Sequence, residues 1–194
     1  MKSLQEIYDE IQAATPSRQS DKGWGAYGPQ PGGPGHTYAQ FYDLLFAKWR
    51  TLPIDFLEIG INKGGSLKMW REFFTSAETI TGFDIQPSFD PFTPSEMIET
   101  HILNAHDEQQ VVGAIGDQTF DIIIDDGPHE AESQVAMYHQ YKHRVKKGGL
   151  YVVEDVQDIA GQWELFNALE PKPTIIDRRW RNGQYDDVLL VFQF

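Results

Sequence analysis

Several short apolar segments of this sequence end in acidic residues, and the positions of these acids are the first indication of chemistry. Four segments end this way, at Glu58, Asp84, Asp125-Asp126 and Glu154-Asp155. If the segments are strands of one parallel sheet, their ends lie at the same edge, where α/β proteins bind ligands. One acid at a strand end is most often a helix cap. Four acids in one crevice repel each other, which requires a compensating cation or shifted pKa values.

The acids of the last two segments are candidate ligands of a metal ion. Asp126, Glu154 and Asp155 follow segments that we expect to be neighbouring strands. The sequence contains no cysteine, and oxygen ligands alone suit a hard divalent ion, Mg²⁺ before Ca²⁺. Such an ion polarises a bound hydroxyl group and lowers its pKa. These three residues therefore predict a Mg²⁺ site.

His129 is the candidate proton acceptor. It lies three residues after Asp126, at the expected start of a helix, and the ordinary pKa of histidine is close to neutral pH. Beside a metal-bound hydroxyl group it would act as a general base. The alternative is an ordinary polar residue in the first turn of a helix.

A glycine-rich turn follows the first apolar segment. The run from Ile54 to Ile59 leads into Gly60, and two further glycines precede the amphipathic run Ser66–Phe74. This order is typical of a buried strand, a tight turn and a helix N-terminus. It is close to the dinucleotide fingerprint G-x-G-x-x-G, but Asn62 stands where the second glycine would be.

Glu58 favours one of the two cofactors that fit such a turn. A carboxylate two residues before Gly60 would repel the pyrophosphate of NAD, because the fingerprint binds an anion through N–H dipoles. S-adenosylmethionine carries ammonium and sulfonium groups and is not repelled. Asp84 lies about 25 residues after the turn, where an acid accepts hydrogen bonds from the ribose that both cofactors contain. The alternative for Glu58 is an acid at a solvated strand end.

The remaining apolar patterns predict alternating strands and helices. Helices are expected near residues 3–14, 38–49, 66–74, 95–99, 111–115, 128–145 and 162–169, and strands at 54–59, 79–83, 101–103, 120–124, 150–153, 174–180 and 188–194. Asn182-Gly183, between the last two strands, is a hairpin signal. Residues 15–35 are so rich in proline and glycine that we expect a loop, either a lid or disordered. The order indicates an α/β fold that ends in an antiparallel hairpin.

Length and charge limit the class of protein. A chain of 194 residues with a net charge of −13 suits one α/β domain with a sizeable core. Because the sequence has no basic stripe, neither nucleic acid nor an anionic membrane surface is an expected partner. The first residues form no apolar leader, and no run approaches the roughly 18 apolar residues of a membrane span. We therefore expect a soluble cytoplasmic protein.

Four motifs together resemble a known family. FLEIGINKGGSLKMWREFF, GFDIQP, IIIDDGPHEAESQ and GGLYVVEDV are similar to motifs of the class I S-adenosylmethionine-dependent methyltransferases. Within that class they resemble the Mg²⁺-dependent sugar O-methyltransferases of antibiotic biosynthesis, of the macrolide and rhamnosyl types. The earlier run SDKGW…HTYAQFYDLLF resembles the segment that helps to close the cofactor site in these enzymes.

The resemblance implies a fold, two cofactors and a role for each candidate residue. The fold is a Rossmann-like, seven-stranded, mostly parallel sheet with a C-terminal antiparallel hairpin and helices on both faces. S-adenosylmethionine is held by Glu58, Gly60, Ser66, Asp84, Ile85, Asn104, Ala105 and Asp125, Mg²⁺ by Asp126, Glu154 and Asp155, and His129 is the general base. The acceptor is a hydroxyl group of a small glycosidic or polyhydroxylated molecule, and a homo-oligomer is possible.

The expected organisation is a single methyltransferase domain over residues 1–194, with N-terminal helices and the lid loop in 1–50 and the sheet in 51–194. The sequence departs from the family at Pro128, where a small polar residue is usual, and it is too short for the additional N-terminal region of the macrolide-type enzymes. Two alternatives stay open: an NAD-dependent oxidoreductase on a similar sheet, and a non-catalytic domain that binds S-adenosylmethionine.

Overall fold

The computed structural model describes residues 1–14, 20–23, 35–86, 92–93 and 96–194. Most of the loop expected at 15–35 and much of the loop expected at 86–95 lie outside the described residues. Within the described residues, no helix is long and apolar enough to cross a membrane.

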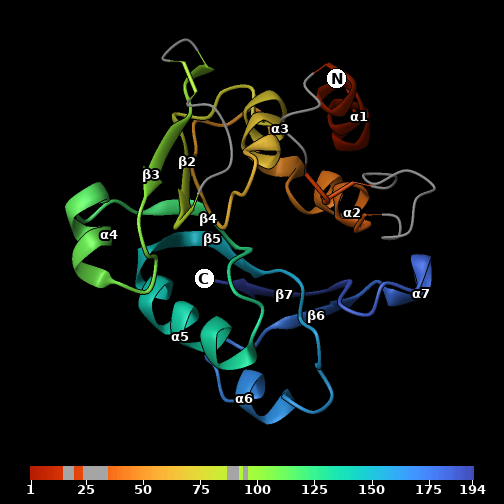
Figure 1. The fold of residues 1–194 in the computed structure, drawn as a ribbon, viewed down its shortest axis with the longest axis vertical. Coiled ribbons are helices and arrows are strands. Elements are labelled where there is room, and N and C mark those ends of the chain that lie inside the picture. Colours follow the sequence, from red (N-terminus) through yellow and green to blue (C-terminus); the bar gives the residue numbers. More distant parts are fainter. Residues whose placement is uncertain (15–19, 24–34, 87–91, 94–95) are drawn as a thin grey trace.

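A seven-stranded sheet forms the centre of the molecule (Figure 1). Its order is β3-β2-β1-β4-β5-β7-β6. The strands are β1 Asp55–Ile59, β2 Thr79–Asp84, β3 Glu99–Ile102, β4 Phe120–Asp125, β5 Val145–Val153, β6 Thr174–Asp177 and β7 Val188–Gln193. Strands β1 to β5 pair in parallel, and β7 pairs antiparallel with both β5 and β6. The predicted fold class is therefore confirmed. The strand order reverses between β1 and β4, the position at which such sheets open a crevice.

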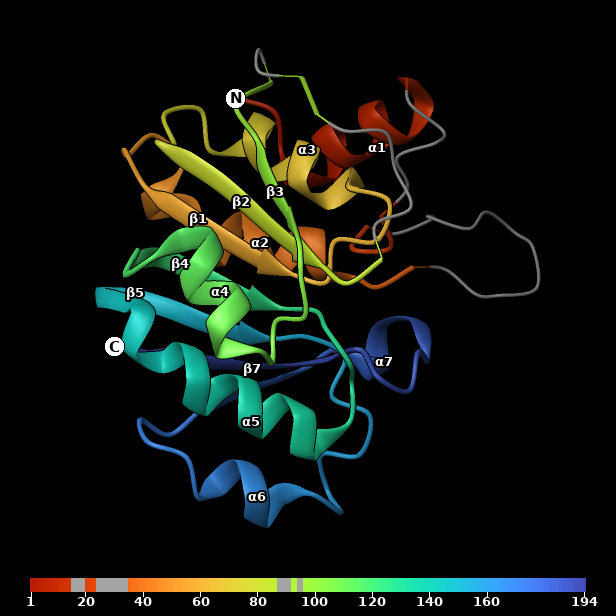
Figure 2. The same cartoon turned by 60° about the vertical axis from the view of Figure 1, so that its left-hand side comes forward.

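Helices cover both faces of the sheet (Figure 2). On one face lie α1 Leu4–Ala14, α2 Tyr38–Leu45 and α3 Gly65–Phe73, and on the other α4 Glu108–Ile115, α5 Ala131–Tyr141 and α6 Trp163–Asn167. Two short 3₁₀ helices, Ala47–Trp49 and Lys142–Arg144, follow α2 and α5. The strands are apolar on both faces, as is typical of parallel sheets. In β1, Phe56 belongs to the core under α3, whereas Leu57 belongs to the core under α5.

The start of α5 differs from the sequence prediction. The helix was expected from Pro128, but it begins at Ala131, after Glu130 in an extended conformation (φ −72°, ψ 134°). Pro128 and His129 consequently stay in the β4–α5 loop, and both line the pocket described below. The strand predicted at 150–153 is longer than expected. It is β5, which begins at Val145 and includes the glycines that were expected to precede it.

The C-terminal hairpin is confirmed, but its connection is not a tight turn. Strands β6 and β7 pair antiparallel from Thr174↔Val191 to Asp177↔Val188. The chain between them forms one short helix, α7 Arg179–Asn182, which ends at Gly183 with φ +76°. Gly183 is thus a left-handed helix C-cap and not the second residue of a two-residue hairpin turn.

The helix predicted at 95–99 is wrong at its C-terminal end, because Glu99 is the first residue of β3.

Aromatic rings fix the helical layer to β1. Phe46, which follows α2, stacks on Tyr42, and the Phe74 ring at the end of α3 lies 5.5–6.0 Å from the rings of Phe46, Phe56 and Trp70. All five side chains are fully buried. This cluster sets the distance of α2 and α3 from the first strand.

Phe74→Ala tests the cluster. Truncating a fully buried phenylalanine removes apolar contacts and leaves a cavity, which should lower the free energy of unfolding by about 3–5 kcal/mol. Leu52→Ala is the control, because Leu52 is 46% exposed and should change stability by less than about 0.5 kcal/mol. Urea unfolding measures both, and equal effects of the two variants would contradict the assignment.

Candidate functional site

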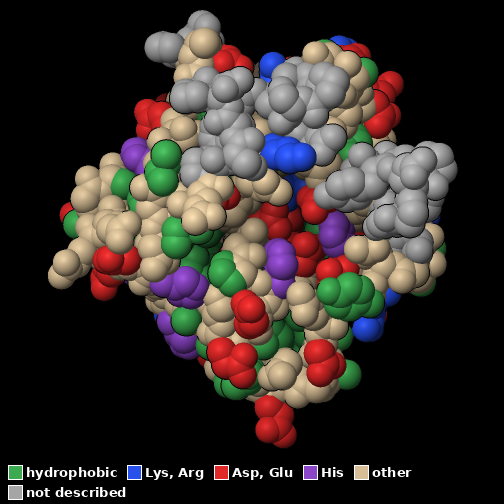
Figure 3. Space-filling view, viewed as in Figure 1, with side chains coloured by type: hydrophobic (Ala, Val, Ile, Leu, Met, Phe, Trp, Pro, Cys, Tyr) green, Lys and Arg blue, Asp and Glu red, His purple; other side chains and the backbone are tan. Residues whose placement is uncertain are grey.

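A pocket of about 430 Å³ lies at the carboxyl edge of the sheet. Its walls come from the residues after β1, β2, β3 and β4, from Met137 of α5, and from Ser20 and Asp21 of the N-terminal segment. In the space-filling view, acidic side chains gather in a hollow near the middle of this face, with histidines beside them (Figure 3). Of the predicted acidic strand ends, those of β2 and β4 line the pocket through Asp84 and Asp126, and its volume is in the range of small-molecule sites.

The glycine turn between β1 and α3 forms one wall. Gly60 has φ +85°, and a Cβ atom there would lie 2.0 Å from the backbone oxygen of Asp126. The Gly60 N–H donates to the Phe83 carbonyl at 2.9 Å, and the N–H groups of Ile61 and Asn62 donate to Oδ2 of Asp84 at 3.0 and 2.7 Å. Gly60 thus allows β1, β2 and β4 to approach closely, and Asp84 fixes the turn.

Glu58 is placed differently from the expectation for a cofactor ligand. It is fully buried and is not among the residues that line the pocket. Its carboxylate accepts from Ser66 Oγ at 2.6 Å and from Trp70 Nε1 at 3.2 Å, and Oε1 lies 3.2 Å from Nζ of Lys22. Burial raises the pKa of Glu58, against the opposing effect of the Lys22 ammonium. The carboxylate therefore links β1 to α3 and to the N-terminal segment.

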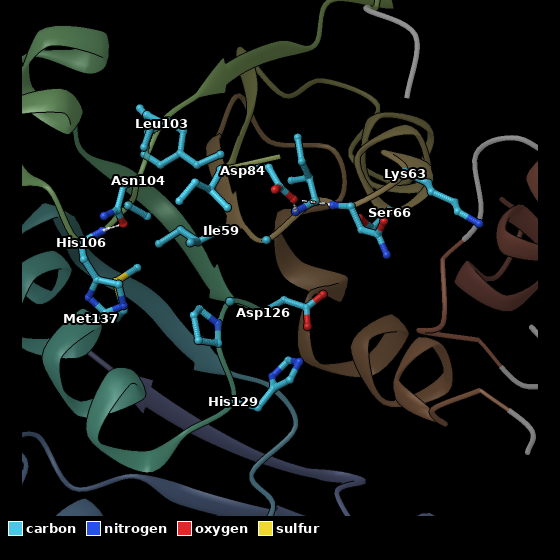
Figure 4. Close-up of a pocket in the computed structure, with 18 of the residues that line it drawn as sticks. Ile59, Lys63, Ser66, Asp84, Leu103, Asn104, His106, Asp126, His129 and Met137 are labelled. Atoms are coloured by element: carbon cyan, nitrogen blue, oxygen red, sulfur yellow. Dashed lines mark hydrogen bonds between the residues drawn. The ribbon is translucent and has the colours of Figure 1, made fainter. Parts of the chain in front are cut away.

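The other predicted cofactor residues divide into two groups. Gly60, Ser66, Asp84, Ile85, Asn104 and Ala105 all line the pocket. Asp125 does not: it is 1% exposed, accepts from Tyr151 Oη at 3.2 Å and from the Gly127 N–H at 3.3 Å, and burial raises its pKa to about 7. In Figure 4, Asp84 lies at the glycine turn and Asn104 and His106 on the opposite side.

The predicted metal and base residues lie close together. Ligand atoms of Asp126, His129 and Asp155 are within 4.8 Å of one another, and Asp126 and His129 point into the same part of the pocket (Figure 4). His129 Nε2 lies 3.8 Å from Oδ2 of Asp155. His129 Nδ1 is buried without a hydrogen-bond partner among the described residues. The side chain of His129 is a third exposed, so it is accessible from the pocket.

Glu154 lies near this group, but both of its carboxylate oxygens accept hydrogen bonds from residues outside the group. Its Oε1 accepts from Tyr42 Oη of α2 at 2.7 Å, and its Oε2 accepts from Lys22 Nζ at 2.5 Å. Asp155 in turn accepts at Oδ1 from Tyr38 Oη at 2.6 Å. Tyr38 and Tyr42 are one helical turn apart on α2, so one face of that helix donates to both consecutive acids.

Lys22 lies among the acids of the site but was not predicted from the sequence as a site residue. Its side chain is 1% exposed, and Nζ lies 2.8 Å from Asp126 Oδ2, 2.5 Å from Glu154 Oε2 and 3.2 Å from Glu58 Oε1. A signal did exist, because four acids on one edge require a cation, and Lys22 stands in the run that resembles a segment closing the cofactor site. The contact itself joins residues 132 positions apart.

Comparison with known proteins bears directly on this geometry. A family model described as a methyltransferase domain matches residues 57–156, from β1 to just beyond β5, slightly more than half of the chain. The chain belongs to this family. The matched stretch contains the glycine turn and all of the acidic strand ends.

Individual relatives of this methyltransferase domain are O-methyltransferases by name. Demethylmacrocin O-methyltransferase of Streptomyces fradiae is 32% identical over 142 residues, which are 62% of this chain and 32% of the relative. The 8-demethyl-8-(2-methoxy-alpha-L-rhamnosyl)-tetracenomycin-C 3'-O-methyltransferase of Streptomyces olivaceus is 33% identical over 146 residues, 71% of this chain and 34% of the relative. The chain spans about a third of the length of these curated relatives.

A solved structure agrees with the fold of the methyltransferase domain. The MycE methyltransferase of mycinamycin biosynthesis, solved with Mg, SAH and mycinamycin VI, is 26% identical with a TM-score of 0.58. The match covers 82% of this chain and 40% of MycE.

The electrostatics of the methyltransferase domain follow from the burial of its acids. Burial raises the pKa of Asp155 to about 7, against the lowering effect of His36, and it raises the pKa values of Asp126 and Glu154 against Lys22. Burial lowers the pKa of Lys22, but the three carboxylates outweigh this and hold it well above its ordinary value.

His36 is a second buried base of the same segment. It stacks on Tyr38, with Nε2 3.5 Å from Asp155 and Nδ1 3.6 Å from Asp187. Burial lowers its pKa, but these carboxylates outweigh burial and raise the pKa to about 9. Asp155 thus has a histidine ring near each of its two oxygens, His36 near Oδ1 and His129 near Oδ2.

Gly60→Ala tests the close approach at the glycine turn. The new methyl group would clash with the Asp126 backbone at a φ that side chains rarely adopt, so stability should fall by at least about 2 kcal/mol. Gly113→Ala is the matched control, because nothing lies within 4 Å of its Cβ position in α4 and alanine is the better helix former. Thermal unfolding that ranks the two variants equally would contradict the role of Gly60.

Proposed function

We propose that this protein is an S-adenosylmethionine-dependent, Mg²⁺-assisted O-methyltransferase that acts on a hydroxyl group of a small glycosidic or polyhydroxylated acceptor. The observation that carries the proposal is one pocket lined by the glycine turn, Asp84, Asp126 and His129, with a ligand atom of Asp155 within 4.8 Å of those of Asp126 and His129. A methyl donor and an activated oxygen must meet within such a space. The names of the sugar O-methyltransferase relatives support the acceptor class.

The turn side of the pocket fits the methyl donor. Gly60 lines the pocket, and the side of its Cα where a side chain would stand is packed against the Asp126 backbone. Oδ2 of Asp84 already accepts two backbone bonds from the turn, whereas Oδ1 accepts one, from the Gln86 N–H at 2.8 Å. Oδ1 therefore keeps a lone pair that can accept from a ribose hydroxyl. In the proposal, Gly60, Ser66, Asp84, Ile85, Asn104 and Ala105 contact the cofactor, while Glu58 and Asp125 support the ends of β1 and β4 from outside the pocket.

The acidic side of the pocket fits a hard divalent ion. Ligand atoms of Asp126 and Asp155 lie within 4.8 Å of each other, and Glu154 shares the Lys22 ammonium with Asp126. The sequence has no cysteine, so the donors are all oxygens, which Mg²⁺ prefers. In the proposal these three residues hold the ion, with the His129 ring beside them. When bound, the ion polarises the acceptor hydroxyl and lowers its pKa.

His129 has the position of the proton acceptor in this proposal. Its partly exposed ring faces the pocket, and Asp155, 3.8 Å away, stabilises the imidazolium that forms when the ring takes the acceptor's proton.

His129→Ala separates catalysis from cofactor binding. Loss of the base should lower the rate of methyl transfer by about 10²-fold or more, while the affinity for S-adenosylmethionine, measured by calorimetric titration, stays within about twofold. His143→Ala is the control, because His143 is exposed on the helix Lys142–Arg144 outside the pocket lining. Full turnover by His129→Ala would refute the assignment of the base.

The reaction class needs a broader test. A methyl-transfer screen with labelled cofactor across sugars, glycosides and phenols, with and without Mg²⁺, should give transfer to a hydroxyl acceptor that falls when the ion is chelated. Failure on every hydroxyl acceptor would refute an O-methyltransferase.

An NAD-dependent oxidoreductase is the competing function. The argument from Glu58 is weaker than the sequence suggested, because that carboxylate is paired with Lys22 and lies outside the pocket lining. Asp126, which does line the pocket, now carries the argument against a pyrophosphate. Calorimetric titration with NAD and with S-adenosylmethionine decides between the two cofactors, and binding of NAD alone would refute our proposal.

A further inference from the structure

The ammonium group of Lys22 lies at the centre of the acidic edge. Glu58 from β1, Asp126 after β4 and Glu154 after β5 surround it, with N–O distances of 2.5–3.2 Å. The lysine side chain is 1% exposed, and those of Glu58 and Glu154 are 0% and 1% exposed. An ammonium has three N–H donors and no acceptor; Lys22 donates two hydrogen bonds, to Asp126 and Glu154, and forms an ion pair with Glu58.

The oxygens bonded to Lys22 include those assigned to the divalent ion. Lys22 Nζ donates to Oδ2 of Asp126 and to Oε2 of Glu154, while Tyr42 donates to the remaining oxygen of Glu154. Both oxygens of Glu154 are thus engaged by side chains from the first 42 residues of the chain. An ion held by Glu154 must share or replace one of these bonds.

It is electrostatically unfavourable for the Lys22 ammonium and a divalent ion to share these buried carboxylates. A divalent cation ligated by Asp126 and Glu154 would lie within a few ångströms of the ammonium, in surroundings where water screens little. Like charges at that separation repel strongly, whereas either cation alone is stabilised by the carboxylates.

We propose that Lys22 is a tethered competitor of the divalent ion, and that its ammonium leaves Asp126 and Glu154 when the ion binds. The inference rests on the ion site of the proposed function. The backbone around Lys22 is anchored: its carbonyl accepts from the Ala39 N–H at 2.8 Å, and the Asp21 carbonyl accepts from the His36 N–H at 2.6 Å. The exchange therefore requires movement of the lysine side chain and not of the whole segment.

The exchange has a consequence for the pocket. Ser20 and Asp21 line the pocket directly, and Lys22 is the next residue. The ion and this lining segment would therefore bind the same carboxylates, those of Asp126 and Glu154. Competition also reduces the apparent affinity for the ion to the intrinsic affinity multiplied by the fraction of molecules in which Lys22 is withdrawn.

The test is a calorimetric titration with Mg²⁺ of the wild type and of Lys22→Met. Removing the competitor should tighten the apparent dissociation constant by at least about tenfold, the factor expected if Lys22 is withdrawn in a tenth of the molecules or fewer. Lys146→Met is the matched control. Lys146 also bridges two carboxylates, Asp55 and Asp121, at 2.5 and 2.9 Å, but it does so at the opposite end of β1 and β4, so the affinity for Mg²⁺ should not change.

Three outcomes would contradict the inference, and they are distinguishable. If Lys22→Met binds Mg²⁺ as the wild type does, the two cations do not compete. If it binds more weakly while Lys146→Met is unchanged, Lys22 supports the ion instead of opposing it. If Mg²⁺ binds to no protein tested, the ion site of the proposed function fails and this inference fails with it.

A second measurement needs no variant. Acetylation of lysines in the wild type, quantified by mass spectrometry, should find Lys22 protected in EDTA and modified several-fold faster in saturating Mg²⁺, with Lys146 unchanged. Protection of Lys22 that persists in saturating Mg²⁺ would overturn the exchange. Lys22→Gln gives the same comparison by calorimetry if Lys22→Met does not fold.

Discussion

The burial of several carboxylates at one edge of the sheet is the constraint on which the rest of this structure depends. Each charge removed from water costs several kcal/mol unless it is paired and hydrogen-bonded. Glu58 and Glu154 meet that cost with the same ammonium, and Glu58 adds a hydroxyl and an indole from α3. The acids consequently determine where α3 and the N-terminal segment must lie.

That constraint explains why the N-terminal part of the chain packs where it does. Helix α2 covers the sheet with an aromatic face, and two of its tyrosines end in hydroxyls bonded to Glu154 and Asp155. Asp155 itself has φ +55°, an unfavourable conformation for a residue with a side chain, and the bond from Tyr38 helps to hold it there. Packing and electrostatics act together in this layer, since the helix that fills the core also satisfies the acids.

The topology brings the two halves of the proposed chemistry together. Because the strand order reverses between β1 and β4, the glycine turn after β1 and the acidic loop after β4 lie side by side. Gly60 permits that contact, since its Cβ position is filled by the backbone of Asp126. One residue thereby links the wall proposed for the methyl donor to the wall proposed for the acceptor and the ion.

The sequence by itself determined the local elements and which residues meet at the sheet edge. Continuous apolar runs indicate buried parallel strands, and the residues after each run must lie at the carboxyl edge; both follow from short-range periodicity. A local signal can have more than one structural use. Asn182-Gly183 lies in the predicted hairpin connection but ends a short helix there, and Pro128 precedes α5 instead of starting it.

Only the tertiary structure decided which groups the acids contact. The sequence placed Glu58 at the cofactor, but the assembled fold turns it towards Ser66, Trp70 and Lys22. The pairing of Lys22 with Glu154 joins positions 132 residues apart, and no periodicity within one element encodes such a contact. The acids at the strand ends predicted a compensating cation or shifted pKa values, and the packing of the chain determined that a lysine of the N-terminal segment lies among them.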